Sequence, residues 1–185
     1  MTTVTIEAGG RKVEVSNADK VLFPGDGITK RHLAEYYAKV APTALPHYRD
    51  RPLTLQRFPD GIGTDGFFQK NAPDHFPDWV ARAEVAKADG TVTHAMANEA
   101  AVLVYLADQG CITLHLALAR ADTPRYPDRM IFDLDPSDDD FGKVQEVARA
   151  VKQALDARGL PSFVQTTGSR GLHIVLSLDA SADVD

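Results

Sequence analysis

The first residues of the chain alternate between apolar and polar side chains, a pattern typical of β-strands. Residues 3–7 and 11–15 follow this alternation on either side of a Gly-Gly turn, which predicts a β-hairpin. Beyond it, Thr29 stands before a helical stripe of apolar residues, and threonine is a common helix cap. We expect this helix to end at Pro42 and Pro46, because proline removes a helix hydrogen bond.

The rest of the chain predicts a mixture of strands and helices. The expected strands are residues 52–58, a short stretch around Phe67-Phe68, 111–118, 129–134, 162–167 and 172–178. Asn98 is expected to cap a helix over residues 99–109. A third, strongly amphipathic helix is predicted for residues 141–158, between two of the strands. This order is typical of an α+β fold.

Composition limits the class of protein. The 185 residues are 44% hydrophobic and 25% charged, the ordinary mixture of a globular domain or of a piece of a larger one. No apolar run is long enough to span a bilayer, and no signal peptide is visible at the N-terminus. The single cysteine, Cys111, excludes an internal disulfide framework and suits a reducing compartment. We therefore expect a cytoplasmic protein.

Charge is distributed unevenly along the chain. The formal net charge is −6, which argues against indiscriminate coating of nucleic acid by a basic surface. Residues 11–82 hold 11 Lys and Arg against 9 Asp and Glu, whereas residues 83–185 hold 9 against 16. Five of these acids lie between Asp133 and Asp140. This stretch is either a solvated acidic loop or a cation site.

Two of those acids favour the cation site. Asp133 and Asp135 are two residues apart on a predicted strand, so both side chains point to the same face. Neighbouring carboxylates repel each other unless something neutralises them, and oxygen ligands suit Mg²⁺ or Mn²⁺. The alternative is a strand that simply runs into an acidic turn at Pro136.

A glycine-rich turn is the second candidate binding site. Between Gly168 and Gly171, backbone amides are free to approach an anion, and Arg170 adds a fork of donors. Thr167 offers a hydroxyl, and His173 follows on the next predicted strand. The alternative is an ordinary hairpin turn with a structural histidine. The turn lacks the spacing of a Walker loop or a dinucleotide fingerprint.

Three smaller features have both a functional and a structural interpretation. His115 lies in a strand, where a lone histidine is usually structural. Phe67 and Phe68 precede a lysine, and exposed aromatics stack on bases; the alternative is that at least one of the two is part of the core. Lys20 and Lys30 flank a Pro-Gly turn and could hold a phosphate, yet most surface lysines have no specific partner.

Taken together, these pieces resemble the polymerase domain of bacterial DNA ligase D, of the archaeo-eukaryotic primase-polymerase superfamily. The motifs that carry the resemblance, in order, are Asp19-Lys20-Val21-Leu22-Phe23-Pro24, Gly27-Ile28-Thr29-Lys30, Arg51-Pro52-Leu53-Thr54, Gly66-Phe67-Phe68-Gln69-Lys70-Asn71-Ala72-Pro73, Pro127-Asp128-Arg129, Phe132-Asp133-Leu134-Asp135-Pro136 and Gly171-Leu172-His173. Their joint occurrence over nearly the whole chain is far more specific than any one of them. The resemblance implies a mixed, largely antiparallel sheet flanked by helices.

The resemblance also implies a role for each candidate residue. By this resemblance, the metal-binding pair is Asp133 and Asp135. The residues that hold the incoming nucleotide are Thr167, Arg170, His173 and His115. The residues that contact DNA are Lys20 and Lys30, at the 5′-phosphate, and Phe67 and Phe68, at the template strand. With Mg²⁺ or Mn²⁺, such a site extends a 3′-hydroxyl with nucleoside triphosphates such as ATP. The implied function is polymerase or primase activity in DNA repair by non-homologous end joining.

The implied partners are DNA ends with a 5′-phosphate, nucleoside triphosphates, Ku, and the ligase and nuclease domains of end joining, with no membrane. The protein would be associated with the nucleoid when it is bound to DNA. The catalytically weak alternative is a module that only binds 5′-phosphorylated ends, and a third possibility is a general metal-dependent phosphohydrolase.

The chain departs from the family pattern in three places. Gln165-Thr166-Thr167-Gly168 stands where the family usually has Lys-Thr-Ser-Gly, and Thr113 stands before Leu114-His115 where it usually has Glu. Ala117 stands where it usually has Trp. The largest departure is length, since family domains run on for roughly another hundred residues and hold a third metal-binding carboxylate there.

We therefore expect residues 1–185 to form a single primase-polymerase-like domain that is truncated or minimal. Asp183 and Asp185 follow the second motif too closely to serve as that third carboxylate.

Overall fold

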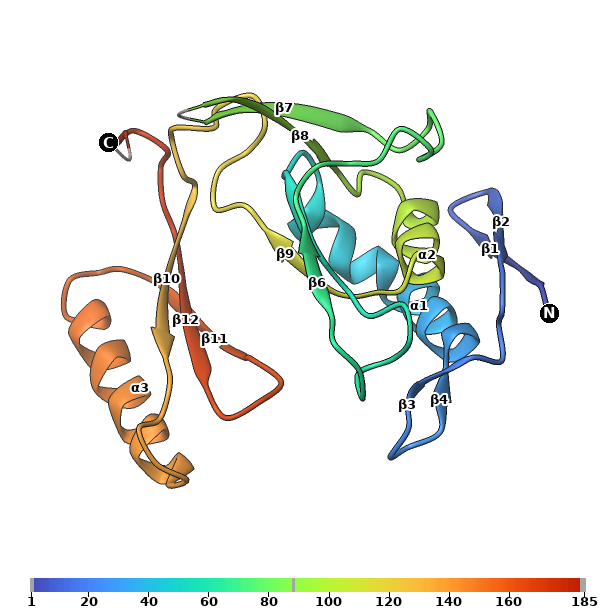
Figure 1. The fold of residues 1–185 in the computed structure, drawn as a ribbon. Helices are drawn as coiled ribbons and strands as arrows, with labels where there is room; N and C mark the ends of the chain where they lie inside the picture. Colours follow the sequence, from blue (N-terminus) through green and yellow to red (C-terminus); the bar gives the residue numbers. More distant parts are fainter. Residues whose placement is uncertain (1, 88, 184–185) are drawn as a thin grey trace. The chain divides into compact units, whose positions relative to one another are not determined.

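The computed structural model describes residues 2–87 and 89–183, so Asp185 lies outside the described residues. The chain divides into two compact units, Met1–Ala117 and Leu118–Asp185 (Figure 1). The local sequence pattern predicts one domain and contains no signal for this division; that the two units act as one domain stays a prediction. Among the described residues, no helix is both long and apolar enough to cross a bilayer.

The first unit is built on an antiparallel sheet. Its strands are β5 (Leu53–Arg57), β6 (Phe67–Gln69), β7 (Arg82–Lys87), β8 (Gly90–Ala95) and β9 (Cys111–Leu116), in the order β6-β5-β8-β7, with β9 also pairing with β5. Strand β5 is therefore central, because it contacts β6, β8 and β9. The predicted strands at 52–58, 67–68 and 111–118 are confirmed, while β7 and β8 were missed.

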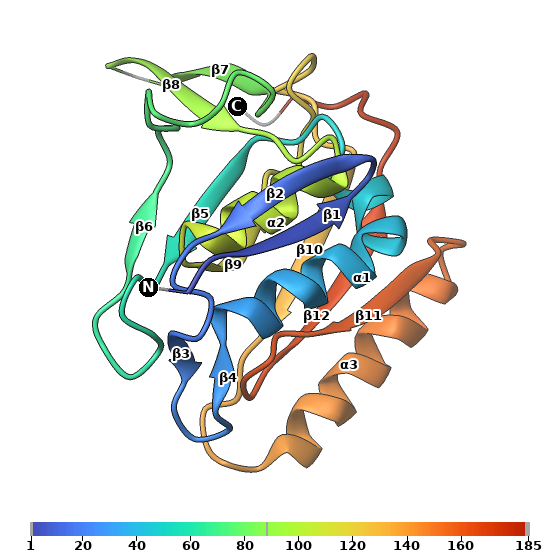
Figure 2. The same ribbon diagram turned by 90° about the vertical axis from the view of Figure 1, so that its right-hand side faces the viewer.

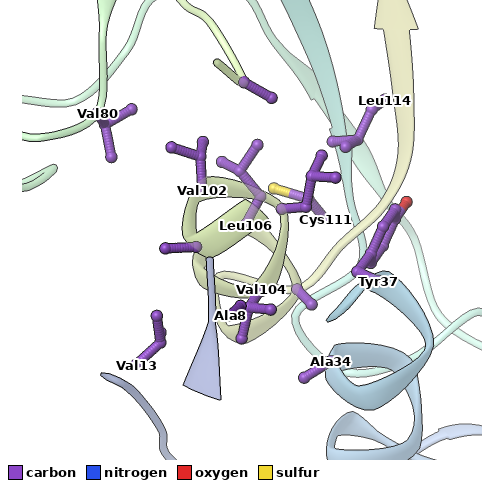
Figure 3. Close-up of a cluster of buried hydrophobic side chains, with 14 of the residues drawn as sticks. Ala8, Val13, Ala34, Tyr37, Val80, Val102, Val104, Leu106, Cys111 and Leu114 are labelled. Carbon is purple, nitrogen blue, oxygen red and sulfur yellow. The ribbon is translucent and has the colours of Figure 1, made fainter. Parts of the chain in front are cut away.

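Two helices cover one face of this sheet, and a hairpin packs against the helices. They are α1 (Lys30–Tyr48), α2 (Ala100–Asp108) and the predicted hairpin of β1 (Val4–Ala8) and β2 (Arg11–Val15), which lies beside both helices in Figure 2. Figure 3 shows side chains of α2, such as Val102 and Leu106, packed among Ala8, Tyr37 and Cys111. A short hairpin of β3 (Val21–Phe23) and β4 (Ile28–Thr29) leads into α1.

Helix α1 begins where the sequence predicts and ends later. Thr29 caps it, with its hydroxyl accepting from the His32 amide. The prediction that Pro42 and Pro46 end the helix is wrong, since the helix continues to Tyr48. Each proline removes one backbone donor, but the residues around them pack against the core and offset that loss.

The cap predicted for α2 is also wrong. Glu99 occupies the N-cap position and makes no side-chain cap bond. The Asn98 side chain instead accepts from the Asp50 amide at 2.8 Å and donates to the Asp50 carboxylate at 2.8 Å. Asn98 thus joins the start of α2 to the turn that follows α1, and burial of nearly all of α2 stabilises the helix without a side-chain cap.

The second unit is a three-stranded antiparallel sheet with one helix. Strands β10 (Arg129–Leu134), β12 (Leu172–Ser177) and β11 (Ser162–Thr166) pair in that order, and α3 (Phe141–Asp156) packs on one face (Figure 1). Asp140 caps α3 by accepting from the Gly142 amide. A separate apolar core forms between α3 and β12, and it includes Val144, Ala148 and Ile174. All four predicted elements of this unit are confirmed, as is the α+β class.

Candidate functional site

The face of the second unit opposite α3 holds the first acidic residue of the candidate site. Asp133 on β10 is directly paired with His173 on β12, which is paired with Gln165 on β11. Because Leu172 and Ile174 point into the core beneath α3, His173 and its two partners point to the other face. Asp133 Oδ1 lies 3.2 Å from His173 Nε2, so β-sheet register alone joins the two predicted motifs.

Asp135 follows the end of β10 rather than lying on it, since the strand ends at Leu134. Its Oδ1 occupies the space beside Gly171, where an added Cβ would come within 2.6 Å of that oxygen and 2.9 Å of the Leu134 carbonyl oxygen. The glycine is therefore required for the carboxylate to approach the turn. Register thus joins Asp133 to His173, and a close approach joins Asp135 to Gly171.

Thr167 closes the glycine-rich turn from within. Its hydroxyl donates to the Gly171 carbonyl oxygen at 3.1 Å and accepts from the Gly171 amide at 3.2 Å. Gly168 has φ +83°, a conformation that favours glycine. Arg170 extends from the turn with 67% of its side chain exposed and pairs with Asp139 at 3.0 Å. The Arg170 guanidinium is thus also accessible to an anionic ligand from solvent.

A lysine side chain partly neutralises the acidic loop before α3. Lys143 of α3 pairs with Asp138, and this hydrogen bond, assisted by the Asp140 amide, lowers the pKa of the Asp138 carboxyl. A hollow of about 250 Å³ lies here, lined by residues that include Asp133, Asp135 and Lys143. The loop therefore stays charged and lies beside the candidate carboxylates.

The donor set can be compared with the needs of a metal ion. In residues 2–87 and 89–183, no three His, Cys, Asp or Glu side chains gather closely enough to hold one. Mg²⁺, however, usually binds through one or two carboxylates plus substrate phosphates and water. Two exposed carboxylates beside a hollow, Asp133 and Asp135, fit that type of site. Asp183 pairs instead with Arg125 at 2.8 Å.

The first unit carries the remaining candidates, two of which meet on its sheet. Phe68 on β6 and His115 on β9 lie on either side of β5, with ring centroids 5.4 Å apart. His115 Nε2 lies 3.4 Å from Gln56 Oε1, on the strand between them. Phe68 is 63% exposed, so the ring is available for stacking and is not part of the core. The core alternative for Phe68 is excluded.

Phe67 lies on the other side of the same strand. It is 46% exposed, and the Arg57 guanidinium lies 5.5 Å from its ring centroid. Arg57 is anchored, because its Nε donates to the Gln109 carbonyl oxygen and its Nη1 to Gln69. The Arg57 guanidinium thus lies against the Phe67 ring, and both phenylalanine side chains remain partly exposed.

Lys20 and Lys30 have different environments although their backbones touch. The Lys30 amide donates to the Lys20 carbonyl oxygen at 2.8 Å. The Lys30 side chain is only 9% exposed, and its ammonium donates to the Asp108 carbonyl oxygen at 2.8 Å and to the carboxylate at 3.2 Å. Lys20, 37% exposed, pairs with Asp60. A DNA role for both lysines stays a prediction, and Lys30 already has two acceptors.

Several residues with a part in these arrangements were missed by sequence analysis, namely Gln56, Arg57, Asp60 and Asp108. Each acts through a partner far away in the chain or across a turn, so no local motif identifies it. A weak signal existed only for Asp60, in the Pro-Asp-Gly turn after β5.

Comparison with known proteins relates the chain to one family. The family model described as LigD, primase-polymerase domain, matches residues 29–185. The LigD proteins of Mycobacterium tuberculosis and Bacillus subtilis are 38% and 30% identical to the chain, over 93% and 92% of its length. The chain spans only 24% and 27% of those two relatives.

A solved structure shares the fold. The polymerase domain of Mycobacterium tuberculosis ligase D in complex with DNA superimposes with a TM-score of 0.84 and 38% identity. The match covers 90% of this chain and 61% of that one. The predicted primase-polymerase type of fold is confirmed. With a family model matching most of its length, the chain belongs to the LigD primase-polymerase domain family.

Proposed function

We propose that this chain carries out metal-dependent, template-directed nucleotidyl transfer at DNA ends or gaps with a 5′-phosphate, in non-homologous end joining. The observation that carries the proposal is the meeting of Asp133 and Asp135 with His173 and the Gly168–Gly171 turn. LigD relatives are end-joining proteins by name, and the structural neighbour was solved with DNA. Both support the same assignment.

Each candidate residue of the second unit has a separate role in the proposed reaction. Asp133 and Asp135 would hold Mg²⁺ or Mn²⁺, which when bound supplies a Lewis acid for the primer hydroxyl and the departing pyrophosphate. Arg170 and the amides of the turn bind and orient the triphosphate. His173, with its Nε2 3.2 Å from Asp133 Oδ1, helps to position that carboxylate on the sheet. Positioning of this kind is most of the catalysis in phosphoryl transfer.

The first unit supplies contacts to DNA in this proposal. The exposed rings of Phe67 and Phe68 stack on template bases, and Lys20 binds the 5′-phosphate. His115 contributes to nucleotide binding by resemblance. Ku and the ligase and nuclease activities of end joining are proposed partners, and the proposed location is the cytoplasm, at the nucleoid when DNA is bound.

Primer extension on a gapped duplex with Mn²⁺ tests the proposal. We expect the native chain to extend the primer according to the template, and the Asp133→Ala/Asp135→Ala variant to lose extension at least a hundredfold. Asp122→Ala is the matched control, since Asp122 is an exposed carboxylate of the same unit. Equal extension by the native chain and the double variant contradicts the proposal, and nucleotide hydrolysis without DNA would favour a phosphohydrolase.

A second candidate function is a binding module for 5′-phosphorylated ends with little catalysis. It is favoured by the absence, in the described part of the chain, of a three-residue metal cluster. In that case the native chain would bind phosphorylated ends without extending primers. The affinity would then be insensitive to Asp133→Ala/Asp135→Ala and would fall when the 5′-phosphate is removed.

A further inference from the structure

The ammonium proposed to bind the 5′-phosphate already has a carboxylate partner. Lys20 Nζ lies 2.5 Å from Asp60 Oδ1, a residue forty positions later in the chain. Both side chains reach solvent, with 37% of Lys20 and 72% of Asp60 exposed. A phosphate that approaches Lys20 therefore meets a negative charge at the same ammonium.

Backbone hydrogen bonds fix the turn that contains Asp60. The Gly61 amide donates to the Phe58 carbonyl oxygen at 3.1 Å, and the Ile62 amide donates to the Leu22 carbonyl oxygen at 2.9 Å. Gly61 has φ +91°, and a Cβ there would lie 2.9 Å from the same Leu22 oxygen. The turn is thus held directly against β3, the strand that follows Lys20.

The backbone of Lys20 is held equally well. Its amide donates to the Asn17 carbonyl oxygen at 2.9 Å, and its carbonyl oxygen accepts from the Lys30 amide at 2.8 Å. The ion pair therefore joins two backbone positions that hydrogen bonds hold in place. Lys30 cannot replace Lys20 at the surface without leaving Asp108, which it contacts through two oxygens.

We propose that Asp60 is a specificity-determining residue that competes with the 5′-phosphate for Lys20. The inference rests on the proposed function, in which Lys20 contacts that phosphate. Asp60 weakens binding of a phosphate dianion both by occupying the ammonium and by repelling the incoming charge. Removal of its charge should tighten binding of phosphorylated ends by roughly three- to tenfold at low salt, and less at high salt.

The test measures the Kd of the full chain for a gapped duplex with a 5′-phosphate or a 5′-hydroxyl at the downstream end. The quantity of interest is the ratio of the two Kd values, the phosphate preference. Four variants are compared with the native chain: Lys20→Met, Asp60→Asn, Lys20→Met/Asp60→Asn and Asp65→Asn. Asp65 is the matched control, because it is exposed and its change alters the net charge equally. Circular dichroism verifies that each variant is folded.

We expect Asp60→Asn to raise the phosphate preference, Asp65→Asn to leave it unchanged, and the double variant to show no preference. If Asp60→Asn behaves like Asp65→Asn or lowers the preference, while Lys20→Met abolishes it, the inference about Asp60 is overturned and the proposed phosphate contact stands. If the native chain shows no preference, or Lys20→Met keeps it, the proposed phosphate contact fails and the inference fails with it.

Discussion

Replacement of Lys30 by methionine should destabilise the first unit strongly. The ion pair with Asp108 is buried, with side-chain exposures of 9% and 11%. Loss of one partner of a buried pair costs about 3–5 kcal/mol, because the other charge is left uncompensated. Asp108 also accepts from the Ser16 amide and hydroxyl, which remain in the variant, so we expect the lower end, about 3 kcal/mol.

Lys20→Met is the matched control for this change. Lys20 and Asp60 form an exposed pair, and such pairs contribute only about 0–1 kcal/mol. Urea denaturation followed by fluorescence of the single tryptophan, Trp79, measures both free energies of unfolding, since Trp79 packs against the core of the first unit. Lys30→Met/Asp108→Asn should recover part of the loss.

The reasoning would be refuted if Lys30→Met and Lys20→Met unfold at the same urea concentration. That result would mean that the Lys30 ammonium is solvated, as a phosphate contact requires. A large loss in Lys30→Met alone would assign the Lys30 side chain a structural role, through its buried ion pair with Asp108. Binding of 5′-phosphorylated DNA by this variant is then measured well below its urea midpoint.

Three further predictions concern separate positions. Gly171→Ala should displace the Asp135 carboxylate, whose oxygen would lie 2.6 Å from the new Cβ, and should reduce primer extension at least tenfold; full activity would contradict the close approach. Phe68→Ala should weaken template binding by about 1–3 kcal/mol with little loss of stability, as gel-shift and melting curves would show, whereas Ile62→Ala, also exposed, should not. Burial raises the pKa of the Cys111 thiol from 9.0 to about 12. The buried neutral thiol therefore makes its full contribution to the stability of the fold below pH 9, and this contribution is lost as pH rises toward 12. The native thiol should resist a thiol reagent at neutral pH, whereas rapid labelling would show that it is accessible.

Local patterns predicted most of the secondary structure. The second unit was predicted closely because its helix has a strong apolar stripe and its strands end at Gly, Pro or Asp. The hairpin β7–β8 was missed, since its alternation is weak and most of its side chains are at least partly exposed. The helix end predicted at Pro42 and Pro46 is wrong because tertiary packing, which a local pattern does not contain, stabilises the end of α1.

The candidate site was predictable to the extent that it follows strand register. Asp133 and His173 occur in separate motifs, and their pairing follows once β10 and β12 are adjacent. The burial of Lys30 was not predictable, because its partner lies at the end of α2, 78 residues away. The same holds for Asp60, whose contact with Lys20 depends on a turn packed against β3.

Nucleotide binding measured with and without Mn²⁺ tests the central claim most directly, namely that Asp133 and Asp135 bind an ion for a nucleoside triphosphate. Isothermal titration without DNA separates this binding from all contacts to the template. We predict that Mn²⁺ tightens ATP binding by the native chain at least tenfold and leaves binding by Asp133→Ala/Asp135→Ala unchanged. The same Mn²⁺-dependent tightening in both proteins would contradict the account.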